Sequence, residues 1–545
     1  MNNIFRITAF AIVDIISSCS TMPAVKVGQI TDRYSNERSA AYESLTPSVN
    51  EEKINSTLEE LFAIIKENSP YASTNTTFVT KFNSFMSYFS DLIDGITIYR
   101  TRYYDTGENE NRTKYTDCID LYYSLIQNYH DLLDAAYKSN YRTVLFGDMS
   151  DEEIQDIIDS YESNEETKQY TLKLEEYSND AEEIYRQSYK ESNYVDSMYE
   201  LLVKYMETAH AYGDYLGDNY LDYVYDNTYD RNYTTKDMHD FYSAVKNDLV
   251  PAATVYKAKI DSINLSSSDK KFITMLDSYN FRYYELDILP EIEEYVYSID
   301  PLSTAYKNLW SNKGLYCFSN SENSLGSAFT TNIRSKSQPI MFFSRNYQDT
   351  FTFIHEFGHY ANFYTTSGVH YPMDISEIDS QGNEMLFASF LLENYEKFEF
   401  SQELIEYINA TKVYSQLNSI INCSFVSEME ETAYNYENLS DKNAFLRKID
   451  DVCDSYGGLA YKKYWWAPVL TNFGYYISYA TSSIGALQLY VNSRNNYDDA
   501  VKSYIKFIRR ACDTSTIDTI TDAVGLLQIY GKDAVKYIAD YIKKQ

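Results

Sequence analysis

Residues 351–361 read FTFIHEFGHYA and hold two of the six histidines of the chain, His355 and His359. Apolar residues recur here at helical spacing, and Asp349 stands where an N-cap is expected, so residues 350–364 are predicted to form a helix. Residues four apart lie one turn apart on the same helix face. Both imidazoles can therefore reach a single ion, and Gly358 between them would let a neighbouring element come close.

The pattern HExxH has a chemical use when it lies on a helix. Zinc accepts neutral imidazoles, and a catalytic zinc needs one further protein ligand and an open position for water. Glu356 can then take a proton from that water, while the ion lowers the water's pKa and polarises a carbonyl. Two histidines on one helix are more often ordinary surface or core residues, but histidine is scarce in this chain. We therefore predict one Zn²⁺ per chain, bound by His355 and His359.

The third ligand must come from a later element. Position 365 is threonine, so the three-histidine extension HExxHxxGxxH is absent. A second helix is predicted from about residue 376 towards 397, and it carries Glu377 and Glu384 on one face. Either glutamate could reach the ion, as in the glutamate-type zinc peptidases.

Length and composition restrict the fold and the partners. The chain has 545 residues, too many for one compact core, and helical spacing dominates, so we expect helical subdomains. We predict an N-terminal helical region over 20–300 and a catalytic region over 301–545, with an edge strand at 338–343. The 47 Lys and Arg against 80 Asp and Glu give a net charge of −33, which disfavours nucleic acid as a partner.

The N-terminus resembles an export signal. Arg6 precedes an apolar run that ends in Ile-Ser-Ser-Cys19, which resembles a bacterial lipoprotein box. Residues 1–19 are thus predicted to direct export, with Cys19 lipidated and anchoring the protein to a membrane. Asp14 inside the apolar run is unfavourable for insertion, and a cytoplasmic protein with an ordinary N-terminal tail is the alternative.

The second-helix motif carries a family resemblance. HEFGH followed by Glu377-x-x-Ser-Gln-x-x-Glu384 resembles the oligoendopeptidase F and thimet oligopeptidase family of zinc metallopeptidases. The resemblance implies a mainly α, zincin-type fold with a deep cleft between helical subdomains and a small edge sheet beside the active-site helix. It also implies that Glu377 is the zinc ligand and that Glu384 orients a ligand, although the spacing from His355 alone would favour Glu384.

A tyrosine-rich segment near residue 475 also looks like this family. Tyr475 and Tyr479 share one helix face, and a phenol there can donate a hydrogen bond to the oxyanion that forms during peptide hydrolysis. In a chain with 58 tyrosines any single one is more often packing. The family usually places a histidine shortly before these tyrosines, but this chain has none after His370.

These observations predict a zinc-dependent metalloendopeptidase that cleaves short peptides, with Glu356 as general base and Tyr475 and Tyr479 as oxyanion donors. The missing histidine supports an alternative, an exported and catalytically impaired homologue that binds peptides. A carboxypeptidase that trims peptide ends is a third interpretation. The sequence predicts no particular oligomeric state.

Overall fold

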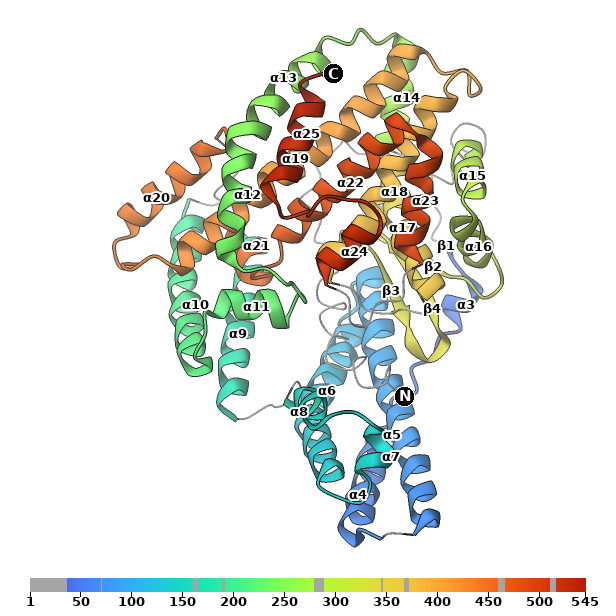
Figure 1. The fold of residues 1–545 in the computed structure, drawn as a ribbon, viewed down its shortest axis with the longest axis vertical. Helices are drawn as coiled ribbons and strands as arrows, with labels where there is room; N and C mark the ends of the chain where they lie inside the picture. Colours follow the sequence, from blue (N-terminus) through green and yellow to red (C-terminus); the bar gives the residue numbers. More distant parts are fainter. Residues whose placement is uncertain are drawn as a thin grey trace. The chain divides into compact units, whose positions relative to one another are not determined.

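A computed structural model describes residues 37–69, 71–159, 165–188, 192–278, 289–344, 347–366, 372–458, 466–509 and 516–545. The chain forms two compact units that interleave in sequence (Figure 1). The first takes the described residues up to Lys168 together with 305–348, and the second takes 169–304, 349–366 and the described residues from 372 onwards. The predicted regions 20–300 and 301–545 divide the chain by sequence order, whereas these units are defined in space.

Long helices form the first unit. Asn50 caps the helix Glu51–Glu67, because its side chain accepts a hydrogen bond from the Lys53 amide at 2.9 Å. Gly107, with φ of 68°, ends the next helix in a left-handed conformation that glycine adopts readily. Apolar faces of these helices form a core of their own that includes Leu61, Phe85 and Leu132. The helices are α3 (Ala40–Glu43), α4 (Glu51–Glu67), α5 (Ala72–Thr106), α6 (Asn109–Tyr137), α7 (Arg142–Phe146) and α8 (Asp151–Asp159).

A small sheet also belongs to the first unit. Its strands are β1 (Glu37–Arg38), β2 (Leu315–Phe318), β3 (Ala328–Ile333) and β4 (Gln338–Phe343), and the turn η3 (Arg334–Lys336) joins the last two. The order β1-β2-β4-β3 places β4 inside the sheet, so the prediction of an edge strand at 338–343 is wrong. Pro339 is tolerated because β2 pairs with β4 only from Ile340 onwards, which leaves the proline beyond the end of that ladder.

Three long helices lie at the centre of the second unit: α18 (Met373–Asn394), α19 (Gln402–Tyr434) and α22 (Ile477–Asn495). Almost every residue of α18 from Met373 to Leu391 is buried, and the same is true of most of α22. Small residues let these two helices approach, since a Cβ on Gly485 would lie 2.5 Å from Ile378 Cδ1. Helices buried all round belong to the interior of a large unit.

The remaining elements of the second unit surround this centre or connect its helices. They are α9 (Glu165–Ser188, shared between the units), α10 (Tyr194–Leu216), α11 (Tyr220–Asn227), η1 (Thr235–Asp237), α12 (Met238–Ala244), η2 (Val245–Leu249), α13 (Val250–Asp261), α14 (Ser267–Ser278), α15 (Leu289–Ser298), α16 (Asp300–Leu309, also shared), α17 (Thr350–Thr366), α20 (Lys442–Ser455), α21 (Trp466–Thr471), α23 (Tyr497–Ile508), α24 (Ile517–Ala523) and α25 (Lys532–Ile542).

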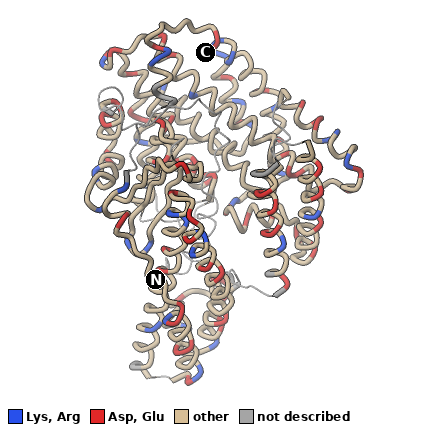
Figure 2. The backbone as a smooth tube through the Cα atoms, turned by 180° about the vertical axis from the view of Figure 1, so that it is seen from behind, with Lys and Arg blue, Asp and Glu red and all other residues tan. Residues whose placement is uncertain are grey.

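The predicted class, mainly α with a small sheet, is confirmed. The predicted cleft, and the place of the sheet beside the active-site helix, involve both units and stay predictions. Acidic residues are spread along many helices with lysines and arginines among them (Figure 2). None of the described helices is long and apolar enough to cross a membrane. The predicted export segment with Cys19, and His370, lie outside the described residues.

Candidate metal centre

The HExxH motif lies on α17, which begins as predicted. Asp349 caps the helix, because its Oδ1 accepts hydrogen bonds from the amides of Phe351 at 3.1 Å and Thr352 at 3.0 Å. His355 and His359 follow on one face, with ring centroids 5.2 Å apart. Their side chains are 14% and 12% exposed, so both rings are largely shielded from solvent.

Helix α18 packs against α17 at the motif itself. A Cβ on Gly358 would lie 2.4 Å from the carbonyl oxygen of Asp379 and 2.8 Å from Ser380 Cα, so only glycine permits this approach. The side-chain amide of Asn383 donates to the carbonyl oxygen of Ile354 at 2.7 Å and joins the two helices. The predicted role of Gly358 in admitting a neighbouring element is therefore confirmed.

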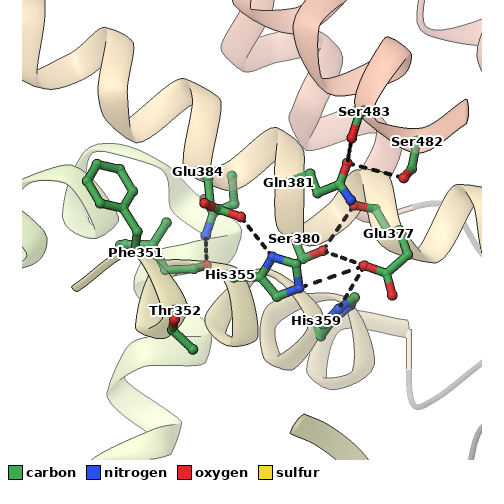
Figure 3. Close-up of polar contacts among 12 residues, drawn as sticks. Phe351, Thr352, His355, His359, Glu377, Ser380, Gln381, Glu384, Ser482 and Ser483 are labelled. Atoms are coloured by element: carbon green, nitrogen blue, oxygen red, sulfur yellow. Dashed lines mark hydrogen bonds and ion pairs between the residues drawn. The ribbon is translucent and has the colours of Figure 1, made fainter. Parts of the chain in front are cut away.

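This approach brings Glu377 of α18 to the two histidines (Figure 3). Its Oε2 lies 3.7 Å from His355 Nε2 and 3.9 Å from His359 Nε2. One ligand atom from each residue lies within 4.8 Å of the other two, and this is the one such cluster of metal-binding side chains among the described residues. Two imidazole nitrogens and a carboxylate oxygen form the donor set of many catalytic zinc sites.

Glu384 lies on the other side of His355. Its Oε1 is 2.8 Å from His355 Nδ1, while its Oε2 is 2.6 Å from Lys412 Nζ on α19. A carboxylate that accepts from Nδ1 fixes the tautomer of the ring and leaves Nε2 for a metal. In the structure Glu377 thus lies beside the two histidine Nε2 atoms and Glu384 lies against His355 Nδ1, while the roles of ligand and orienting residue stay predictions.

The charges at the centre favour metal binding. Burial by itself would raise the pKa of Glu384, but Lys412 and His355 lower it to about 2. Burial, reinforced by the nearby His355, lowers the pKa of His359 well below its usual value. A neutral imidazole is the form that binds zinc, and an ionised Glu384 is the form that accepts from His355. The residues present therefore fit a divalent metal ion.

Glu377 and α18 are held in place by polar contacts of their own. Ser380 Oγ donates to Glu377 Oε2 at 3.3 Å and to its carbonyl oxygen at 3.0 Å. Gln381 Oε1 accepts from Ser482 at 3.1 Å and Ser483 at 3.0 Å, both on α22 (Figure 3). These bonds connect the segment that carries Glu377 to the helix that carries Tyr479.

The other predicted site residues lie on α17 or on and beside α22. Glu356 lies between the histidines in sequence and is buried, with 1% of its surface exposed. Tyr475 is buried and lies two residues before the start of α22 at Ile477, whereas Tyr479 in the first turn of α22 is half-buried. Their hydroxyl oxygens are 2.9 Å apart. The structure therefore brings the two tyrosines together as a hydrogen-bonded pair.

Sequence reasoning missed Lys412 and Arg231. Lys412 contacts Glu384, and its Nζ lies 4.1 Å from the ring centroid of Phe351. Arg231 is buried and forms an ion pair with Asp374, three residues before Glu377. No motif surrounds either residue, because their partners are far away in sequence.

Known proteins resemble this chain in fold and, over part of its length, in sequence. A PZ peptidase A structure with an inhibitor matches with a TM-score of 0.62 and 15% identity, covering 92% of this chain and 98% of that one. The chain has the fold of the PZ peptidase and oligoendopeptidase F structures. A Bacillus anthracis protein assigned as an oligoendopeptidase F matches with a TM-score of 0.56 and 15% identity, covering 94% and 98%.

The sequence comparison agrees over a shorter stretch. An oligoendopeptidase F homolog of Borreliella burgdorferi is 26% identical over 194 residues, which are 32% of this chain and 31% of that protein. The match thus spans about a third of the curated relative. No family model matches the chain. The resemblance to oligoendopeptidase F, predicted from the glutamate motif, is confirmed.

Proposed function

We propose that the chain is a zinc-dependent metalloendopeptidase that hydrolyses short peptides. The observation that carries this proposal is the convergence of His355 Nε2, His359 Nε2 and Glu377 Oε2, with Glu384 behind His355. The similarity to oligoendopeptidase F and PZ peptidase structures supports a peptidase, and the donor set supports zinc as the metal. We likewise propose, from the N-terminal sequence, that the protein is exported and anchored through a lipidated Cys19.

His355, His359 and Glu377 would hold one Zn²⁺. When bound, the ion supplies Lewis-acid polarisation of the scissile carbonyl and lowers the pKa of water. Glu356 accepts the proton of the attacking water and returns it to the leaving amine. Glu384 keeps His355 in the tautomer that leaves Nε2 for the metal.

Tyr475 and Tyr479 have different parts in stabilising the oxyanion. Tyr479 is the more exposed of the pair, so it donates to the oxyanion as the carbonyl becomes tetrahedral. Tyr475 is buried, with its hydroxyl 2.9 Å from that of Tyr479, so it orients the donor. Both residues lie on or beside α22, whose Ser482 contacts the Glu377 segment through Gln381.

One observation favours a second function. The chain has no histidine after His370, whereas the family resemblance leads us to expect one before the tyrosines. A homologue without this donor would bind peptides and cleave them slowly or not at all. A carboxypeptidase, the third interpretation, would release single residues from peptide ends.

The test uses the purified chain, its zinc content and internally quenched peptides. The wild type is expected to bind one Zn²⁺ and cleave internal bonds. Glu356→Gln keeps the size of the side chain and the metal ligands, so zinc content should stay the same while kcat falls by roughly 10²-fold to 10⁴-fold.

Glu428→Gln is the matched control, since Glu428 pairs with Lys246 and Tyr456 and not with the metal centre. It should leave kcat unchanged. Cleavage that survives Glu356→Gln would contradict the proposal. Zinc-dependent peptide binding without turnover by the wild type would establish the binding function, and product masses would reveal end-trimming.

A further inference from the structure

The turn that precedes α22 is held through its main chain by distant side chains. The hydroxyl of Tyr229 donates to the carbonyl oxygen of Phe473 at 3.1 Å. The amide of Gly474 donates to Glu430 Oε1 on α19 at 2.8 Å. Neighbouring backbone groups of the turn thus have side-chain partners from two other parts of the second unit.

Arg231 binds carbonyl groups of the same turn. Its Nη1 donates to the carbonyl oxygen of Gly474 at 2.7 Å, and its Nη2 donates to that of Tyr475 at 3.4 Å. Arg231 and Glu430 therefore hold the two ends of a single residue, Gly474. We refer to Arg231, Glu430 and Tyr229 as the turn clamp.

The backbone conformation and the close neighbours of Gly474 favour glycine at this position. Its φ is 77°, and a Cβ would lie 3.0 Å from Val224 Cγ1 and 3.3 Å from Tyr229 Cε2. Glycine adopts a positive φ without a steric penalty. The close approach brings the main chain within reach of the clamp.

The arginine of the clamp is fully buried, which is costly for a cation. Its guanidinium carbon lies 4.5 Å from the ring centroids of both Tyr225 and Tyr229, and its Nε is 3.0 Å from Asp374 Oδ2. A buried ion pair contributes little net stability compared with apolar residues of the same volume. The burial of this cation is better explained by the arrangement of several hydrogen bonds, which a guanidinium can make and an ammonium group cannot.

Asp374 extends the clamp to the metal centre. Its Oδ2 accepts from Ser478 at 2.9 Å and its Oδ1 accepts from Thr481 at 2.7 Å, both on α22. Asp374 lies in the first turn of α18, one helical turn before Glu377. The same network therefore fixes the tyrosine segment and the start of the helix that carries the third ligand.

We propose that Arg231 and Glu430 are positioning residues for the Tyr475–Tyr479 hydroxyl pair, acting by holding the Gly474 turn from both ends. The inference rests on the proposed function, because it assigns the clamp to the oxyanion donor of that reaction. Neither residue needs to touch substrate. A loosened turn would let Tyr475, and hence Tyr479, move away from the reacting carbonyl.

Glu430 offers the cleaner test of the two. Burial raises the pKa of Glu430 to about 8, against the opposing effects of the Gly474 amide and Arg231. The side chain is therefore mainly protonated at neutral pH, and glutamine is a close substitute that still accepts from Gly474. Methionine has a similar size but provides no acceptor.

Glu430→Met is expected to lower kcat by roughly 10²-fold, the loss that a small misplacement of a catalytic group produces. KM and zinc content should not change, because the metal ligands and substrate contacts are retained. Hydrogen–deuterium exchange should rise at residues 473–479 and not in α17. Glu430→Gln should restore both kcat and protection. Arg231→Lys should also lower kcat and raise exchange at residues 473–479, and because it loses hydrogen bonds to Asp374 it should in addition raise exchange at the start of α18.

A double-mutant cycle separates positioning from general destabilisation. In a Tyr479→Phe background the clamp has no donor left to position, so Glu430→Met should cause no further loss of kcat. Equal losses in both backgrounds, unchanged exchange at 473–479, or no effect of Tyr479→Phe would overturn the proposal. If Glu430→Met does not fold, Glu430→Asp loosens the same contact and enters the same cycle.

The outcomes also distinguish this inference from the proposed function. A wild-type chain that binds zinc but cleaves no peptide contradicts the proposed function itself. If the wild type is active but the losses of kcat caused by Glu430→Met and Tyr479→Phe are additive, only the positioning role of the turn clamp is contradicted.

Discussion

Lys412, Glu384 and His355 form a chain of contacts that orients one of the proposed metal ligands. Lys412 Nζ is 2.6 Å from Glu384 Oε2, and Glu384 Oε1 is 2.8 Å from His355 Nδ1. The lysine keeps the glutamate ionised in a buried position where it would otherwise favour its proton. The affinity of the metal centre is therefore expected to depend on a residue that does not touch the metal.

Lys412→Met tests this dependence. Burial raises the pKa of Glu384, and Lys412 is the largest opposing influence, so removal of the ammonium group should raise that pKa from about 2. Glu384 then gains a proton as the pH falls, and it no longer accepts from His355. We expect zinc affinity to fall by roughly 10-fold to 100-fold at neutral pH, as for other residues that orient a ligand, and by more at pH 5 than at pH 8.

Competition with a chromophoric chelator over this pH range measures the effect. Lys412→Arg keeps the positive charge and is the control, so it should retain most of the affinity. Equal zinc affinity of wild type and Lys412→Met at every pH would contradict the role of Lys412.

Local spacing was enough to predict some of these residues and not others. His355 and His359 share a face because of helix geometry alone, so their spacing of four residues is enough to predict that their side chains lie close together. Glu377 and Glu384 lie on one face of α18, and the sequence could not choose between them without the family resemblance. The choice depends on how α18 lies on α17, which is decided at Gly358 and by Lys412 on a third helix.

At the scale of elements, the centre depends on the close contact between α17 and α18. Gly358→Ala should improve the helix propensity of α17 by about 1 kcal/mol. The new methyl would also lie 2.4 Å from the carbonyl oxygen of Asp379, which is backbone and cannot turn aside. Overpacking of this kind costs about 1 to 3 kcal/mol or more, so the clash outweighs the gain.

We therefore expect Gly358→Ala to lower the free energy of unfolding and to weaken zinc binding together, since the helices must separate. Denaturant unfolding and zinc titration measure the two effects. Gly382→Ala is the matched control: its Cβ would meet Leu489 Cδ1 at 2.9 Å, the end of a flexible side chain. If Gly358→Ala and Gly382→Ala lowered the free energy of unfolding and the zinc affinity equally, the contact at Gly358 would not be what the centre depends on.

Elements were predicted best where their signals are local. Helix α17 begins at Thr350 as expected because the Asp349 cap acts within three residues. Helix α18 begins at Met373, three residues before the predicted start, because Pro372 rather than a polar cap precedes it. The position of β4 within the sheet depends on pairing with β2 and β3, which no pattern within residues 338–343 could reveal.

At the scale of the whole molecule, the proposed metal ligands all belong to the second unit, whereas the first unit has a core of its own. A ligand that binds only the folded state stabilises it by RT ln(1 + [L]/Kd), about 4 kcal/mol at a thousand times Kd. Zinc should therefore protect the helices that carry its ligands, while the α4–α6 core gains no contact with the ion.

Hydrogen–deuterium exchange of the zinc-loaded and chelator-treated chain tests this distribution. We expect removal of zinc to raise exchange in α17 and α18 and to leave α4, α5 and α6 unchanged. In His359→Ala, which lacks one proposed ligand, zinc should change exchange in neither group of helices. If chelation raised exchange in α4–α6 as much as in α17, the two units would unfold as one, and the stabilisation by zinc would belong to the whole chain.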